Sequence, residues 1–111
     1  MPDLTIKLGD FQVITLDRQN SFDPNPIHMA YIRYNGTIPQ GNQSVLAFEI
    51  GRYDGNKDVQ EGSPYYLPVT EKIIDCRVDT YGRRVKLKII EASSLEIKAR
   101  DLTERQSAVR D

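Results

Sequence analysis

The sequence predicts an all-β fold: an antiparallel β-sandwich or small barrel of about seven to eight strands, with at most one short helix. Three observations lead to this prediction. Apolar residues recur at every second position. Clusters of Gly, Pro, Asn and Asp separate these runs at intervals of about ten residues. One long segment also has the pattern of two strands that pair as a hairpin.

The two-residue period is clearest in two short segments. In LTIKL, the apolar residues Leu4, Ile6 and Leu8 alternate with Thr5 and Lys7. In VLAFEI, residues 45–50, the larger apolar side chains again occupy alternate positions. Because successive side chains of a strand point to opposite faces, each segment is expected to bury one face.

The segment KIIDCRVDTYGRRVKLKII, residues 72–90, predicts a hairpin. Its inward residues oppose each other only if the loop has an even number of residues. The predicted register pairs Asp79 with Arg84 and places Asp75 opposite Lys88. The remaining predicted pairs are Val78 with Val85, Cys76 with Leu87, Ile74 with Ile89 and, as a like-charged pair, Arg77 with Lys86.

Residues 26–34 are compatible with a strand or a helix. Asn25 is a candidate helix cap, with Pro26 at the first helical position and Gly36 beyond the end. The following segment, residues 35–50, is a natural return strand. We therefore favour a strand.

Residues 94–109, at the end of the chain, are also compatible with a strand or a helix. LEIKAR alternates as a strand, whereas SSLE matches a helix-capping box at Ser93 and Glu96. We expect a strand over 95–100. The chain of 111 residues then forms a single β domain over 1–102, with 103–111 as a short helix or frayed tail.

Charge and composition argue against several classes of partner. Fifteen Lys and Arg residues balance sixteen Asp and Glu residues, giving a net charge of -1. No overall positive field attracts nucleic acid, so none is expected as a partner. No apolar run approaches the roughly 20 residues that span a membrane. The single cysteine, Cys76, and the lack of a recognisable secretory signal favour a cytoplasmic location.

The segment GRYDGNKDVQEG raises the question of a metal site. Asp54, Asn56 and Asp58 occupy alternate positions, as oxygen ligands do in calcium loops. An EF-hand is excluded because Val59 and Tyr65 stand where it needs Gly and Glu. A bare turn is favoured over an irregular calcium loop, since Asp-Gly forms hairpins without an ion.

No residue pattern supports catalysis, and no cofactor is expected. His28 is the only histidine, and no serine lies in a G-x-S-x-G motif. Cys76 falls at an inward position of the predicted hairpin, where a thiol packs as a small hydrophobe. We expect a protein that is not an enzyme.

The most promising binding residues are aromatic and basic. Tyrosine and arginine are enriched in binding hot spots because each combines a large contact area with a polar end. Tyrosine is also a good strand residue, so part of the set is expected in the core. The candidate binding residues are Tyr31, Arg33, Tyr34, Arg52, Tyr53, Tyr65 and Tyr66.

These observations favour a non-catalytic protein-interaction or assembly module that binds a protein partner or itself, as a homo-oligomer. A small subunit of a larger multi-protein particle, of the phage or injection type, is one form of such a module. The alternative is a β domain that binds a small ligand or a carbohydrate on its tyrosines, with a calcium ion at Asp54, Asn56 and Asp58.

Overall fold

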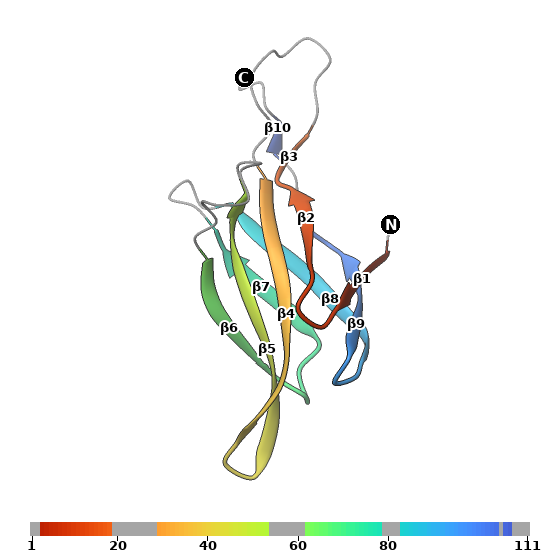
Figure 1. Cartoon of the computed structure of the whole chain (residues 1–111). Helices are drawn as coiled ribbons and strands as arrows, with labels where there is room; N and C mark the ends of the chain where they lie inside the picture. Colours follow the sequence, from red (N-terminus) through yellow and green to blue (C-terminus); the bar gives the residue numbers. More distant parts are fainter. Residues whose placement is uncertain (1–2, 19–28, 54–61, 79–82, 105, 108–111) are drawn as a thin grey trace.

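The structure is a computed structural model that describes residues 3–18, 29–53, 62–78, 83–104 and 106–107 (Figure 1). Every regular element in these residues is a strand. The strands are β1 (Asp3–Lys7), β2 (Phe11–Thr15), β3 (Asp17–Arg18), β4 (Met29–Gln40), β5 (Gln43–Tyr53), β6 (Gly62–Pro68), β7 (Ile73–Arg77), β8 (Arg84–Ala92), β9 (Glu96–Asp101) and β10 (Gln106–Ser107).

Eight of these strands form two antiparallel sheets. Sheet A has the order β1-β9-β8-β7, and sheet B has the order β2-β4-β5-β6. The short strands β3 and β10 form a separate parallel pair. The two four-stranded sheets pack as a sandwich and are not closed into a barrel, which confirms the all-β prediction and selects the sandwich. The described residues include no helix long and apolar enough to cross a membrane.

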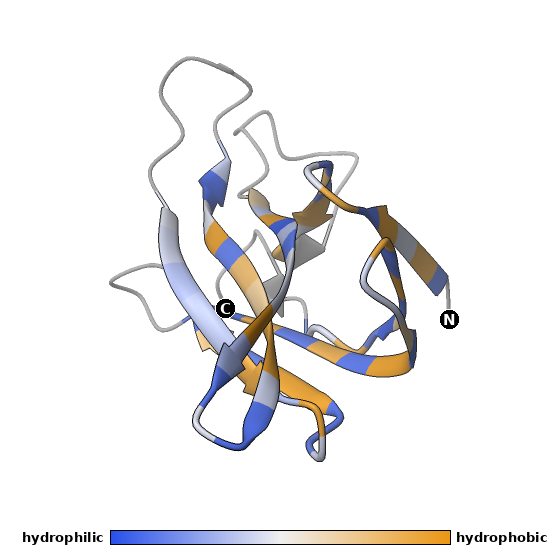
Figure 2. Ribbon diagram, turned by 60° about the horizontal axis from the view of Figure 1, so that its bottom comes forward, coloured by the Kyte–Doolittle hydropathy of each residue, from blue (hydrophilic) through white to orange (hydrophobic). Residues whose placement is uncertain are grey.

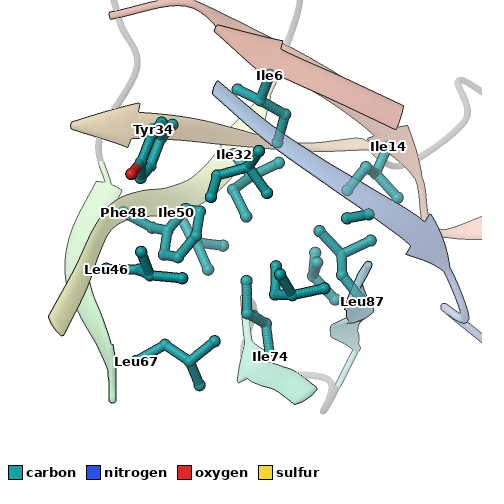
Figure 3. Packing of buried hydrophobic residues seen from close by; sticks show 14 of the residues in the cluster. Ile6, Ile14, Ile32, Tyr34, Leu46, Phe48, Ile50, Leu67, Ile74 and Leu87 are labelled. Carbon is teal, nitrogen blue, oxygen red and sulfur yellow. The ribbon is translucent and has the colours of Figure 1, made fainter. Parts of the chain in front are cut away.

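The core lies between the two sheets (Figure 3). Alternation along the strands, visible in Figure 2, supplies the inward side chains. Leu46, Phe48 and Ile50 all lie in this core, as predicted. Each fully buried aliphatic or Phe side chain contributes about 1.5–3 kcal/mol of transfer free energy. Other members from both sheets include Ile6, Ile14, Ile32, Leu67, Ile74, Val85, Leu87 and Ile97.

The chain crosses from sheet A to sheet B in a tight turn between β1 and β2. The Asp10 amide donates to the Lys7 carbonyl at 2.9 Å, and Gly9 has a φ of 83°. Glycine suits this position because it adopts positive φ without steric strain. Leu8, expected inward with Leu4 and Ile6, is 48% exposed because the strand has already ended.

The predicted register of the β7–β8 hairpin was wrong by two residues. Asp75 lies opposite Lys86 rather than Lys88, and Ile74 lies opposite Leu87. The like-charged pair is Arg77 with Arg84. A shift of two residues keeps every side chain on its predicted face, so the apolar alternation does not distinguish the two registers.

The hydrogen bonds that fix the observed register flank the hairpin. The Val78 amide donates to the Arg83 carbonyl at 2.9 Å, and the Ile89 amide donates to the Lys72 carbonyl at 2.7 Å. The predicted partner Asp79 lies outside the described residues.

Both ambiguous segments contain strands where they are described. Residues 29–34 belong to β4, and β9 covers 96–101, close to the predicted 95–100. Ser93 explains the helix signal: its Oγ accepts hydrogen bonds from the amides of Leu95 and Glu96 at 3.2 and 3.1 Å. A helix cap uses the same interaction, but here it closes the β8–β9 turn.

The described part of the tail is extended, since Gln106–Ser107 pair with β3. The residues just before it are anchored: Thr103 is buried, and its Oγ1 accepts from the Lys86 amide at 3.1 Å.

Strands β4 and β5 form the longest hairpin. A bulge after Tyr34 shifts the register, and Gly36 there has a φ of 95°. Gly41 begins the two-residue turn with a φ of 63°. Residues 37–44 are exposed, and the tip extends beyond the remaining strands (Figure 1).

Candidate recognition surface on the outer face of sheet B

The outer faces of the two sheets differ in chemistry. On sheet A the outward positions of all four strands carry mainly charged side chains. They include Asp3, Thr5, Lys7, Ile73, Asp75, Arg77, Arg84, Lys86, Lys88, Glu96, Lys98 and Arg100. On sheet B the outward positions are mainly apolar or aromatic. They include Phe11, Val13, Met29, Tyr31, Arg33, Ile38, Val45, Ala47, Glu49, Tyr53 and Tyr66.

Tyr31 is the centre of the sheet B face. Its hydroxyl donates a hydrogen bond to Oε2 of Glu49, and its side chain is fully buried. A side chain at Gly62 would collide with the Tyr31 hydroxyl, so the glycine leaves the space that the phenol occupies. Burial, followed by the hydrogen bond and the charge of Glu49, raises the pKa of Tyr31 to about 12.

Arg33 lies beside Tyr31 on the same face. Its guanidinium carbon is 5.7 Å from the ring centroid of Phe11 and 6.0 Å from that of Tyr31. Cation–π attraction to two rings restricts its position. Its Nη1 atom is 3.9 Å from Oε1 of Glu49, which is an ion-pair distance but too long for a hydrogen bond.

The Nε atom of Arg33 is buried and has no hydrogen-bond partner among the described residues. One third of the side chain remains exposed. A buried donor without a partner costs about 1–3 kcal/mol, so the arginine has unused hydrogen-bonding capacity. The side chain is thus held in place while part of it faces solvent.

Phe11 connects the two tyrosines of this face. Its ring centroid is 6.1 Å from that of Tyr31 in an edge-on geometry, and 6.0 Å from that of Tyr53. Such aromatic pairs add about 0.5–1.5 kcal/mol beyond their buried area. We call Phe11, Tyr31, Arg33, Glu49 and Tyr53 the Arg33 cluster.

Three large apolar side chains remain exposed around the Arg33 cluster. Val13 is 36% exposed, Ile38 41% and Tyr66 52%. They come from β2, β4 and β6, so exposed apolar groups extend across the sheet and along the long hairpin. These three side chains leave apolar area exposed to solvent on three strands of the face.

The structure divides the predicted binding residues between the two faces. Tyr31, Arg33, Tyr53 and Tyr66 share the outer face of sheet B. Tyr34 lies in the core, where its hydroxyl donates to the Ser93 carbonyl at 2.6 Å.

The other two candidates lie away from the Arg33 cluster. Tyr65 packs against the core, and its hydroxyl accepts a hydrogen bond from the Asp75 amide at 3.3 Å. Arg52 is exposed and alternates with the outward residues of β5.

Sequence reasoning missed Phe11 and Glu49. Both had a usable signal: Phe11 alternates with Val13 in FQVIT, and Glu49 is the only charge in VLAFEI. A single charge in an apolar strand often marks a specific partner, here the phenol of Tyr31 and the guanidinium of Arg33.

Other candidate chemistry is limited. Asp54, Asn56, Asp58 and His28 lie outside the described residues. Among the residues that are described, no three His, Cys, Asp or Glu side chains form a group suited to a metal ion. Burial raises the pKa of the Cys76 thiol, which disfavours the reactive thiolate.

A separate concavity of about 330 Å³ lies between the base of the β4–β5 hairpin and the end of β8. Leu46 and Ile89 contribute buried apolar area, whereas Val69 and Ile90 are more than 40% exposed. The described residues that line it include no aromatic side chain.

Comparison with known proteins gives no match to a family model, a curated protein or a solved structure.

Proposed function

We propose that the chain is a non-catalytic protein-interaction or assembly module that uses the outer face of sheet B. The observation that carries the proposal is the Arg33 cluster, in which an arginine lies between aromatic rings and its buried Nε has no hydrogen-bond partner among the described residues. Arg and Tyr in such settings are the residue types that dominate binding energy at protein interfaces.

The surroundings of the cluster support protein rather than nucleic acid as the partner. The net charge of the chain is -1, and Glu49 offsets Arg33 on this face. A phosphate-binding surface would need an excess of basic residues. The exposed apolar groups of Val13, Ile38 and Tyr66 instead suit a protein surface. A single cysteine keeps the cytoplasm as the proposed compartment.

Association of the pure chain tests the proposal. Light scattering over a concentration series should show a rise in mass. Arg33→Ala should weaken association about tenfold or more, because truncation of a hot-spot residue typically costs over 1 kcal/mol. The matched control is Arg100→Ala on sheet A, where the arginine is half exposed and paired with Asp3. That variant should associate as the wild type does.

Two results would refute the proposal. One is a chain that stays monomeric and recovers no protein from a native lysate. The other is equal loss of association in Arg33→Ala and Arg100→Ala, because the outer face of sheet B would then have no special role.

Small-ligand binding is the second candidate, supported by the 330 Å³ concavity beside Val69 and Ile90. Its size is at the lower end of ligand pockets. A carbohydrate platform is less favoured, since only Tyr66 among the described tyrosines is more than half exposed. A melting-temperature screen against small apolar compounds tests this candidate, since binding to the folded state raises the melting temperature. Stabilisation that Ile90→Lys abolishes would support it.

A further inference from the structure

In an antiparallel ladder, every second residue of an edge strand points its backbone N–H and C=O groups away from the sheet. The Tyr34 amide donates to the Asp10 carbonyl at 3.2 Å, and the register continues from this pair into β2. Gln12 therefore faces β4, while the N–H and C=O groups of Phe11 and Val13 point away from the sheet. Those groups make no hydrogen bond to any described residue.

The opposite edge of sheet B is blocked. Continuing the same alternation through β4 and β5 places the backbone groups of Gly62, Pro64, Tyr66 and Pro68 on the outer side of β6. The two prolines have no N–H to donate. Half of the outward positions of β6 therefore offer no donor to the carbonyl groups of an added strand. Proline at this position is a common way to prevent edge pairing.

The β1 edge of sheet A is partly occupied and charged. The Thr5 carbonyl accepts from Nε2 of Gln12 at 3.0 Å, and the Lys7 carbonyl accepts from the Asp10 amide at 2.9 Å. Asp3 and Lys7 add charges at the two ends of the strand. Charged side chains disfavour pairing with a neighbouring chain.

The β7 edge is protected in a similar way. The Asp75 amide donates to the Tyr65 hydroxyl at 3.3 Å, and the Asp75 carbonyl accepts from Arg84 at 3.4 Å. The five-residue strand also carries Asp75 and Arg77.

Strand β2 lacks the charges and prolines within the strand that protect the other edges. Its sequence, FQVIT, contains neither a charge nor a proline. Val13 is 36% exposed. A concavity of about 330 Å³, lined in part by Phe11, Gln12 and Lys7, lies beside the same edge. Among the described residues, no strand pairs with this side of β2.

We propose that two copies of the chain associate through their β2 strands, joining the two B sheets into one antiparallel sheet of eight strands. This inference rests on the proposed function and names the partner as a second copy. The twofold axis passes beside Gln12, and Phe11 of each copy pairs with Val13 of the other. This register uses only the backbone groups of Phe11 and Val13 that have no partner among the described residues.

A second copy suits this edge because β2 is self-complementary. A symmetric pair brings each residue near its own equivalent, so a charged strand would meet like charges. Uncharged β2 avoids that repulsion. On the outer face the pairing places each Phe11 ring beside a Val13 side chain, an aromatic and β-branched pair that favours strand association. It also joins the two Arg33 clusters into one continuous surface.

Proline substitution tests the edge. Val13→Pro removes an outward N–H and adds a ring where the second copy would lie, without removing a bond inside the chain. The control is Ile73→Pro on β7, also at an outward, 41% exposed edge position. Sedimentation should be followed to about 0.5 mM, because interfaces below the usual ~1,600 Å² bind weakly. We expect a dimer for wild type and Ile73→Pro, and a monomer for folded Val13→Pro.

Cross-linking tests the register, even if the proline variant fails to fold. At the axis, the Gln12 positions form a non-hydrogen-bonded pair with Cα atoms about 4.5 Å apart, within disulfide range. In a Cys76→Ala background, Gln12→Cys should form an intermolecular disulfide on mild oxidation. Val13→Cys should cross-link far less, because it faces Phe11 of the second copy.

The results separate this inference from the proposed function. A dimer that survives Val13→Pro but is lost in Arg33→Ala overturns β2 pairing and leaves the interaction module standing. Preferential cross-linking of Val13→Cys overturns the register. A monomer at every concentration overturns β2 pairing, and it also overturns the proposed function if no other protein binds.

Discussion

The outer faces of the two sheets have the same strand geometry but opposite chemistry. On sheet A, charges on neighbouring strands pair with each other: Asp3 with Arg100 at 3.2 Å and Asp75 with Arg84 at 2.6 Å. On the outer face of sheet B, the charges among the described residues are Arg33 and Glu49, which lie 3.9 Å apart among aromatic rings. On the first face Lys and Arg outnumber Asp and Glu, and part of the charge is paired. On the second face the buried Nε of Arg33 has no hydrogen-bond partner among the described residues.

The difference shows which face is better suited to contact with water. A dense array of exposed charges is readily solvated and disfavours contact with another chain. An apolar face that holds an arginine in place offers a partner apolar contacts and the exposed part of an already ordered guanidinium side chain. Substitutions on the two faces should therefore have different consequences.

The largest effect on stability is expected for Gly62→Ala. The added methyl group would overlap the Tyr31 hydroxyl and lie 2.9 Å from Cγ of Glu49. Displacing the buried phenol should reduce the free energy of unfolding by about 3 kcal/mol. Gly41→Ala is the control, because no atom lies near its added methyl and only its positive φ adds strain, about 1 kcal/mol. Equal losses in urea unfolding would contradict tight packing at Gly62.

Tyr31→Phe should have an intermediate effect that depends on pH. At neutral pH it removes one hydrogen bond, at a cost of about 1 kcal/mol. Because the fold raises the pKa of Tyr31 from 10.0 to about 12, the unfolded chain releases this proton first. The stabilisation is complete below pH 10 and is lost as the pH rises towards 12.

The loss of unfolding free energy at alkaline pH should be smaller in Tyr31→Phe than in wild type. Urea unfolding measured between pH 9 and 11 tests this, because the normal pKa of tyrosine is about 10. Parallel stability curves for the two proteins over this range would show that Tyr31 has no raised pKa.

Arg33→Met should separate stability from association. Loss of two cation–π contacts destabilises the fold, while removal of a buried donor without a partner stabilises it. The terms oppose each other, so unfolding free energy should change by less than about 1 kcal/mol. Association should still weaken about tenfold or more. A loss of stability above about 2 kcal/mol would make Arg33 a structural residue instead.

The smallest effect is expected on sheet A. Arg100→Gln breaks the exposed ion pair with Asp3, and such pairs contribute at most about 0.5–1 kcal/mol. Stability and association should both stay close to wild type in calorimetry and light scattering. A marked loss of association in this variant would move the binding face to sheet A.

The sequence predicted the fold well because alternation is a local signal. The two-residue period of apolar side chains predicts that residues such as Leu46 and Ile74 are buried, and they are. The same period could not fix the β7–β8 register, since a shift of two residues leaves Ile74 on the same face. Choosing between the registers depends on contacts between strands, including the ion pair of Asp75 and Arg84.

The candidate site was only partly predictable for a related reason. Tyr31 and Arg33 stand out by residue type, but so do Tyr34 and Tyr65, which lie inside. The bulge after Tyr34 and the pairing of β2 with β4 determine which residues share a face. Phe11 reaches Arg33 only through that long-range pairing, which sequence spacing does not reveal.

Backbone amide NMR spectra recorded over a concentration series test the central claim most directly. We predict concentration-dependent shifts at Phe11 and Val13 on β2 and at Arg33 and Tyr53 beside them, with the amides of β7 and β9 unchanged. Shifts confined to the charged strands of sheet A would contradict the claim that sheet B provides the binding surface.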